Sequence, residues 1–260
     1  MAGAFFCLMS NVIFLHGFCE RLEMWDGVIS GLTESQDTCY AVDLPGFGEN
    51  EVTADSMAGM AHFVFRFMDE HQIPSAVIIG HSMGGYVALE MVSQFPDRIN
   101  GIGLIHAHAG SDTDEKIQNR KKLIDFVLQH GTDIFLKAFS KQLVSTSNTN
   151  KTISDQAFEL VKRTQHEAVI AASTAMMHRR DHRATVGTIT QPMLWIIGKQ
   201  DTFAPFAQII QQSDTCKQAM VEVMDDVGHL CMYEDLAQTV HIVQRFLQWI
   251  NQVSAGAETQ

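Results

Sequence analysis

The sequence predicts an α/β fold in which a mostly parallel β-sheet is flanked by helices on both faces. Short apolar stretches typical of buried strands alternate with longer stretches whose apolar residues recur at helical spacing. Helical connections between such strands are right-handed crossovers, which make neighbouring strands parallel. A polar, helix-rich segment then interrupts this alternation and predicts an all-helical insertion. We therefore expect residues 1–109 and 187–260 to form the core, and residues 110–186 to form a helical cap.

Six stretches carry the strand pattern, being short, apolar and rich in β-branched or aromatic residues. Several of them end in glycine-containing loops, which stop a strand. Open α/β sheets bind ligands where the carboxyl ends of their strands meet, and the cap could roof that edge. The predicted strands are Asn11–Leu15, Thr38–Val42, residues 76–79, Ile99–Ile105, residues 193–197 and Ala219–Met224.

Helices are predicted between these strands and throughout the insertion. The clearest one carries a Met/Phe stripe at helical spacing; Asp55 or Ser56 could cap it, and it ends before Pro74. A polar break at residues 145–150 divides the insertion into two pairs of helices. The other predicted helices are residues 25–32, 84–94, 112–129, 133–143, 154–165, 166–178, 205–212 and 236–250.

Composition and charge exclude several classes of partner. The chain has 260 residues and a formal net charge of −12, with no block of Lys and Arg, so nucleic acid and anionic membrane surfaces are poor partners. No apolar run approaches membrane-spanning length. The apolar N-terminus lacks a basic region, and a signal peptide would consume the first strand. The oligomeric state is not predicted.

The cysteines point to a reducing compartment. There are five of them, Cys7, Cys19, Cys39, Cys216 and Cys231, and no C-x-x-C pair. An odd, scattered set cannot form a complete disulfide framework. We therefore expect small buried apolar residues in a cytoplasmic protein.

The stretch Gly80-His81-Ser82-Met83-Gly84 joins a predicted strand to a predicted helix and fits the G-x-S-x-G pattern. A strand that turns sharply into a helix around a serine strains the backbone of that serine. The residues two positions away must then be nearly free of side chain, or the turn clashes with itself. Such a turn exposes the serine hydroxyl at the carboxyl edge of the sheet.

Reactive residues follow four of the predicted strands and therefore arrive at one edge of the sheet. They are Ser82, the loop that begins at His16, Asp201 and His229. A serine hydroxyl needs a base to take its proton; His229 could serve, and Asp201 could orient its imidazole. The order Ser, Asp, His along the chain is that of hydrolases with a nucleophile turn.

Attack by Ser82 would create an oxyanion that needs two N–H donors. The backbone N–H of Met83, directly after the serine, is one candidate, and that of Phe18, in the loop after the first strand, is the other. Removing one such donor typically costs about 3 kcal/mol in the transition state.

Other interpretations of these residues remain open. Asp201 could merely begin a turn. Asp112 and Asp114, shortly after another strand, are the rival acids. His106 and His108 also lie at a strand end, and we interpret them as pocket-lining or surface residues.

A transition-metal site is conceivable but unsupported. His16, His81, His106 and His108 could supply ligands, yet no H-x-x-x-H motif or carboxylate spacing accompanies them. We expect no metal and no cofactor.

Taken together, five motifs resemble those of the α/β-hydrolase superfamily, and the resemblance spans nearly the whole chain. Within it, the chain is similar to small serine esterases with a helical cap, a group that includes enol-lactonases and acyl-carrier methyl-esterases. The resemblance implies a core sheet, a cap after Ile105, and Ser82, Asp201 and His229 as the triad. The motifs are Leu15-His16-Gly17-Phe18, Asp43-Leu44-Pro45-Gly46-Phe47-Gly48, Gly80-His81-Ser82-Met83-Gly84-Gly85, Gly198…Asp201 and Gly228-His229.

The chain departs from this family pattern near its start. Members usually open with a β-hairpin, but only about ten residues precede the first strand here, so we expect a sheet short by about one strand or with an irregular edge. Serine at the turn also distinguishes the chain from haloalkane dehalogenases and epoxide hydrolases of this fold, which place an aspartate there.

The sequence-based hypothesis is therefore a serine hydrolase that cleaves a small or medium carboxylic ester through an acyl-Ser82 intermediate. Lactone and carbon–carbon bond hydrolases share the triad, and buried basic residues in a crowded pocket would favour a carboxylate-bearing substrate. A small-molecule sensor that acts through a protein partner is the alternative from another class. The expected pocket residues are His16, Trp25, His81, Phe203 and Leu230.

Overall fold

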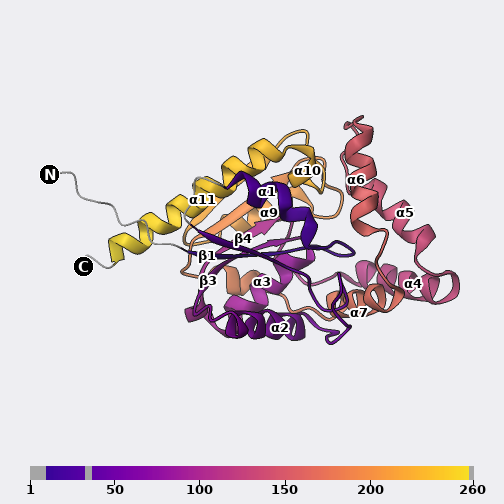
Figure 1. Cartoon of the computed structure of the whole chain (residues 1–260), viewed down its shortest axis with the longest axis horizontal. Coiled ribbons are helices and arrows are strands. Elements are labelled where there is room, and N and C mark those ends of the chain that lie inside the picture. The colour runs from indigo at the N-terminus through magenta and orange to yellow at the C-terminus, as the bar shows by residue number, and fades with distance from the viewer. Residues whose placement is uncertain (1–9, 33–36, 258–260) are drawn as a thin grey trace.

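A computed structural model describes residues 10–32 and 37–257 of the chain. In this part of the chain six strands form one sheet in the order β2-β1-β3-β4-β5-β6, and every neighbouring pair is parallel. The predicted parallel sheet with flanking helices is confirmed (Figure 1). The apolar N-terminus with Cys7 lies outside the described residues, and the four described cysteines are free.

Four strands have the predicted bounds, and two run further than their apolar stretches. In β3 the ladder continues to the pairs Gly80–Leu104 and His81–Ile105, because backbone pairing does not require an apolar side chain. The strands are β1 (Asn11–Leu15), β2 (Thr38–Val42), β3 (Ala76–His81), β4 (Ile99–Ile105), β5 (Met193–Gly198) and β6 (Ala219–Met224).

Helices pack on both faces of the sheet (Figure 1). Helices α2 (Met57–Glu70) and α3 (Met83–Gln94) pack against each other on one face, and α1 (Asp26–Gly31) and α11 (Leu236–Ala257) pack on the other. Ser56 caps α2 by accepting a hydrogen bond from the Gly59 N–H at 3.1 Å. The remaining elements of the core are η1 (Leu22–Trp25), η2 (Pro96–Arg98), α9 (Phe206–Ser213) and α10 (Cys231–Glu234).

Five helices lie between β4 and β5, and α4 packs on α7 while α5 packs on α6. α6 begins three residues earlier than expected because the side chain of Asn150 caps it, accepting from the Thr152 N–H at 3.0 Å. α8 was not expected, since four residues are too few to show a helical period. The helices are α4 (Asp114–His130), α5 (Asp133–Gln142), α6 (Lys151–Val161), α7 (His166–Met177) and α8 (Arg183–Val186).

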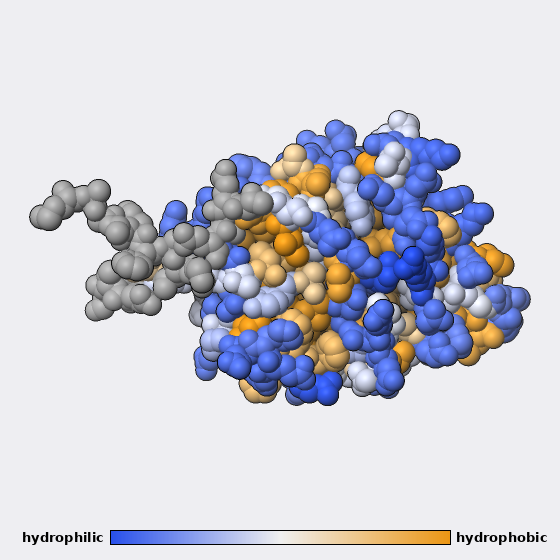
Figure 2. Space-filling model, in the orientation of Figure 1, coloured by the Kyte–Doolittle hydropathy of each residue, from blue (hydrophilic) through white to orange (hydrophobic). Residues whose placement is uncertain are grey.

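The division of the chain into a core and a cap at residues 110 and 186 remains a prediction. In Figure 1, α5 and α6 stand at one end of the molecule, away from the start of β1 and the end of α11. Hydrophilic residues occupy much of the face that Figure 2 shows, with apolar groups between them. No described helix has the length and apolar character needed to cross a bilayer.

Candidate active site

Ser82 occupies a strained turn between β3 and α3. Its backbone angles, φ 48° and ψ −110°, lie in a region that residues with side chains rarely adopt. The turn closes only because two neighbours are glycines. A Cβ on Gly80 would lie 2.3 Å from the carbonyl of Gly84, and one on Gly84 would lie 2.4 Å from the carbonyl oxygen of Leu15. The close approach predicted from the G-x-S-x-G spacing is therefore present.

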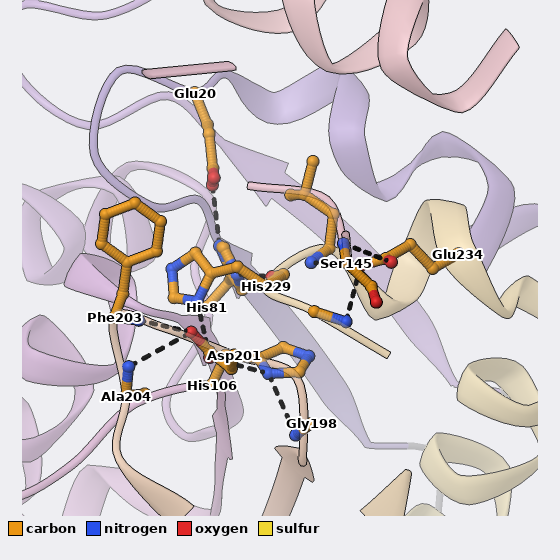
Figure 3. Close-up of polar contacts among 12 residues, drawn as sticks. Glu20, His81, His106, Ser145, Gly198, Asp201, Phe203, Ala204, His229 and Glu234 are labelled. Carbon is orange, nitrogen blue, oxygen red and sulfur yellow. Dashed lines mark hydrogen bonds and ion pairs between the residues drawn. The ribbon is translucent and has the colours of Figure 1, made fainter. Parts of the chain in front are cut away.

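Asp201 and His229 are hydrogen-bonded and almost fully buried. Asp201 Oδ2 lies 2.7 Å from His229 Nδ1, and Asp201 Oδ1 accepts the backbone N–H groups of Phe203 and Ala204 at 2.8 and 3.2 Å (Figure 3). Burial alone would raise the pKa of Asp201, but His229 and His106 hold it well below its ordinary value. An ionised Asp201 therefore fixes the proton of His229 on Nδ1 and leaves Nε2 as the acceptor.

His229 is neutral in this environment near pH 7. Burial lowers its pKa below the ordinary 6.5, although the carboxylate of Asp201 acts in the opposite direction. The ring of Phe203 packs on its imidazole with centroids 4.9 Å apart. The backbone N–H of His229 donates a hydrogen bond to the carbonyl oxygen of Leu143 at 2.9 Å. These contacts hold the imidazole in one place and one tautomer.

A buried pair, Glu20 and His81, supports the position of His229. His81 Nδ1 lies 2.7 Å from Glu20 Oε2, and His81 Nε2 lies 2.7 Å from the backbone carbonyl oxygen of His229. The Glu20 carboxylate and the His229 carbonyl therefore face the two ring nitrogens of His81 and can accept hydrogen bonds from them. Burial alone would raise the pKa of Glu20, but His81 lowers it below its ordinary value. The Glu20 carboxylate also accepts a hydrogen bond from the Gly17 N–H at 2.7 Å, and this bond connects it to the loop that carries Phe18.

A cavity of about 380 Å³ contains both Ser82 and His229. Its wall combines four phenylalanines with several polar and charged residues. Of the five residues expected to form the pocket, Phe203 lines this cavity and the other four do not. The lining residues are Phe18, Glu20, Ser82, Lys116, Asn119, Arg120, Leu123, Phe135, Ala138, Phe139, Gln142, Phe203 and His229.

The other four expected pocket residues are buried elsewhere in the core. His16 Nε2 accepts from the Leu44 N–H at 2.9 Å, which joins the loops that follow β1 and β2. Trp25 packs on Phe14 with ring centroids 5.1 Å apart. His81 belongs to the pair with Glu20, and Leu230 is fully buried beside His229 in the chain. Apolar or aromatic type alone does not reveal which side a residue faces.

The two expected oxyanion donors come from two different elements. Met83 is the first residue of α3 and is buried, and Phe18 lies in the loop after β1 with its ring against the ring of Phe139 at 5.7 Å. Their roles remain predictions.

The remaining candidates take different places from those expected. His106 and His108 are buried, so neither is a surface residue, and neither lines this cavity. His108 lines a separate small pocket with Tyr86 and Arg179. His106 Nδ1 lies 3.2 Å from the same Asp201 oxygen that pairs with His229. Asp112 pairs with Arg120 and Arg179 at 2.6 and 2.5 Å.

Three ligand-type groups converge at Asp201. Donor atoms of His106, Asp201 and His229 lie within 4.8 Å of one another, and two imidazoles with a carboxylate can bind a transition metal. A metal there would displace the 2.7 Å hydrogen bond between Asp201 and His229 Nδ1. The hydrogen bond explains the arrangement with no metal, and we retain that interpretation.

Comparisons with known proteins show the family of the chain. Residues 11–236 match the family model of the alpha/beta hydrolase fold. The chain is 40% identical over 97 residues to a dihydrolipoyllysine-residue acetyltransferase component of the acetoin cleaving system from Cupriavidus necator, covering 36% of this chain and 26% of that protein. It thus spans about a quarter of that relative's length.

Two further relatives match over almost their whole lengths. A pimeloyl-[acyl-carrier protein] methyl ester esterase from Photobacterium profundum is 27% identical over 247 residues, covering 92% of this chain and 95% of that protein. A thermophilic esterase from Thermogutta terrifontis has a similar structure, with a TM-score of 0.87 and 24% identity over 93% of this chain and 90% of that chain. The structural likeness shows the fold.

Proposed function

The chain belongs to the α/β-hydrolase fold family, and we propose that it hydrolyses carboxylic esters through an acyl intermediate on Ser82. The observation that carries this proposal is the buried Asp201–His229 pair beside the cavity that also contains Ser82. The esterase relative that matches along nearly its whole length supports the same chemistry.

In the proposed mechanism, His229 Nε2 takes the proton of the Ser82 hydroxyl as its oxygen attacks the ester carbonyl. Asp201 orients the imidazole and stabilises the imidazolium that forms. The backbone N–H groups of Met83 and Phe18 bind the developing oxyanion. His229 then protonates the leaving alcohol, and a water activated by the same histidine releases the acid from Ser82.

The setting of the site is also part of the proposal. Helices α4 and α5 supply residues 116–123 and 135–142 of the cavity wall, which agrees with residues 110–186 acting as a cap. The free cysteines among the described residues agree with a reducing, cytoplasmic location.

Turnover of a p-nitrophenyl ester series by wild type and by Ser82→Ala tests the proposal. We expect hydrolysis by the wild type and a loss of at least about 10³-fold in the variant, because the alanine lacks the hydroxyl oxygen on which the acyl intermediate forms. Equal Tm values would show that the variant is folded. Retained activity in Ser82→Ala would refute the nucleophile assignment, and folded wild type that cleaves lactones but no esters would refute the ester proposal.

A further inference from the structure

Helix α4 presents one face to the cavity, and that face carries cations. Lys116, Asn119, Arg120 and Leu123 all line the cavity. They lie at positions i, i+3, i+4 and i+7, which form a single stripe on a helix. The end of the stripe nearer the helix N-terminus is therefore basic and polar, while Leu123 continues it into the apolar wall.

Lys116 is partly buried with no counterion of its own. Its Nζ donates to the carbonyl oxygen of Phe203 at 3.4 Å. Within the described ranges 10–32 and 37–257, no carboxylate lies within 4.0 Å of this nitrogen to form an ion pair. Burial lowers the pKa of Lys116, and repulsion from Arg179 and Arg120 lowers it further, although Asp112 and Asp201 act in the opposite direction. An anion beside this ammonium would relieve both effects.

The neighbouring charges are also unbalanced. Asp112 is shared by two guanidinium groups, since Arg120 Nε lies 2.6 Å from one of its oxygens and Arg179 Nη1 lies 2.5 Å from the other. Lys116 adds a third cation to this single carboxylate. His108, next to the cluster, responds to the excess: burial and these cations lower its pKa to about 3.

Arg120 keeps donors available for a ligand. Only its Nε is bonded to Asp112, and in the part of the chain that the structure describes its two Nη groups make no hydrogen bond to protein. The residue lines the cavity, and its side chain is 20% exposed. A guanidinium held by Nε is well placed to bind a carboxylate through the other two nitrogens.

The acidic residue of the cavity does not cancel this cluster. Glu20 lines the wall, but its carboxylate is paired with His81 and accepts a hydrogen bond from Gly17 N–H. The cationic wall contrasts with a chain of net charge −12, so general surface charge does not account for it.

We propose that Lys116 and Arg120 form a subsite for a carboxylate group carried by the substrate ester, an inference that rests on the proposed function. The subsite lies close to the reacting atoms, because Lys116 contacts the carbonyl of Phe203, whose ring lies 4.9 Å from that of His229. A short spacer must therefore separate the carboxylate from the ester. Half-esters of short dicarboxylic acids, and esters of short hydroxy acids, have this form.

Matched substrates test the subsite. Monomethyl glutarate carries the carboxylate on the acyl side, 4-acetoxybutyrate carries it on the alcohol side, and dimethyl glutarate is the neutral reference. For wild type we expect kcat/KM to be at least about tenfold higher for one of the two anionic esters than for the neutral one, as one charge-assisted hydrogen bond provides. The preferred anionic ester identifies the side that faces α4.

Variants assign the preference to the two cations. Lys116→Gln and Arg120→Gln should each reduce the anionic-to-neutral ratio of kcat/KM by about tenfold, with KM for the anionic ester rising. Lys116→Arg keeps the charge and should restore most of the ratio. Lys122→Gln makes the same charge change at an exposed position of α4 and should leave the ratio at the wild-type value.

Two outcomes would overturn the subsite: a wild-type enzyme that shows no preference for either anionic ester, or a preference that survives both substitutions. Failure of the proposed function looks different, because then no ester of either charge is turned over. In that case calorimetric titration with glutarate decides the subsite by itself. Binding that is lost in Lys116→Gln and kept in Lys122→Gln supports the subsite, and no binding to wild type overturns it.

Discussion

At the scale of single residues, the pair formed by Glu20 and His81 shows how the site is held in place. His81 bridges a carboxylate on the loop after β1 and the backbone of His229, which follow strands far apart in the sequence. The same carboxylate accepts the Gly17 N–H, next to the expected oxyanion donor Phe18. One buried ion pair therefore positions both halves of the proposed machinery.

Glu20→Gln should test this positioning role. The amide keeps the shape but does not stabilise a proton on His81 Nδ1, so the hydrogen bond to the His229 carbonyl weakens. A charge-assisted hydrogen bond contributes about 1.5–3 kcal/mol, and we expect kcat to fall at least about tenfold with a smaller change in KM. Glu23→Gln is the matched control, because the Glu23 side chain is 46% exposed. Unchanged kcat in Glu20→Gln would contradict the role.

The pH dependence of activity should report His229. Its pKa is lowered from the ordinary 6.5 by burial, so the neutral, basic form persists below that pH. Activity should therefore fall only as the pH drops through this lowered value, and kcat/KM at pH 6.5 should exceed half of its plateau. A pH–rate profile of kcat/KM measures the midpoint. A midpoint above 6.5, or a flat profile from pH 4.5 to 8, would contradict the assignment.

The residue types and the predicted strand ends were enough to predict that Ser82, Asp201 and His229 lie at one edge of the sheet. They could not reveal Glu20 and His81, since partners 61 residues apart leave no spacing in the sequence. The sequence did not indicate Lys116 and Arg120 either. Helix α4 has many exposed charged residues, and only the packing of the helix shows which of them line the cavity. For the same reason, the sequence did not show that His106 and His108 are buried.

At the scale of elements, the turn between β3 and α3 depends on close backbone contacts. Gly84 lies in the first turn of α3, against the end of β1. A Cβ on Gly84 would lie 2.4 Å from the carbonyl oxygen of Leu15 and 2.7 Å from that of His16. Because these are backbone atoms, relief requires a shift of the strand or the helix.

Gly84→Ala should therefore destabilise the fold and disturb the site together. We expect a loss of more than about 2 kcal/mol in the free energy of unfolding, measured by urea denaturation, with reduced kcat. Gly187→Ala is the matched control: its Cβ would meet nothing closer than 3.7 Å, and its φ is −67°. That change should be neutral or slightly stabilising. Equal stability of the two variants would contradict the steric argument.

Element types were predicted well where the hydrophobic period was strong, as in the six strands and α2. The predicted bounds of helices and strands were wrong where a side-chain cap or backbone pairing determines where the element begins or ends. Asn150 starts α6 earlier than the apolar pattern suggests, and β3 continues through Gly80 and His81 without an apolar residue beyond Ile79. The short α8 and α10 carry too few residues for any period.

At the scale of the whole molecule, the helices between β4 and β5 are bonded to the loop that carries His229. The backbone N–H of His229 donates to the Leu143 carbonyl at 2.9 Å. The Glu234 carboxylate accepts the N–H of Ser145 at 2.8 Å and that of Gly228 at 3.0 Å (Figure 3). These hydrogen bonds therefore join the segment between α5 and α6 to the loop of the proposed base.

Glu234→Ala should loosen this connection. It leaves three backbone N–H groups, those of Ser145, Gly228 and Leu230, without their acceptor. Each one that stays buried costs about 1–3 kcal/mol, so we expect the free energy of unfolding to fall by at least about 2 kcal/mol. Hydrogen exchange should speed up at Ser145 and Gly228, which lie on the two segments that Glu234 joins, and kcat should fall because His229 lies between them. Glu222→Ala removes an exposed ion pair with Arg245 and should cost less than about 1 kcal/mol without changing exchange at either site. If Glu234→Ala and Glu222→Ala give the same exchange pattern, the helical segment and the loop of His229 are not coupled through Glu234.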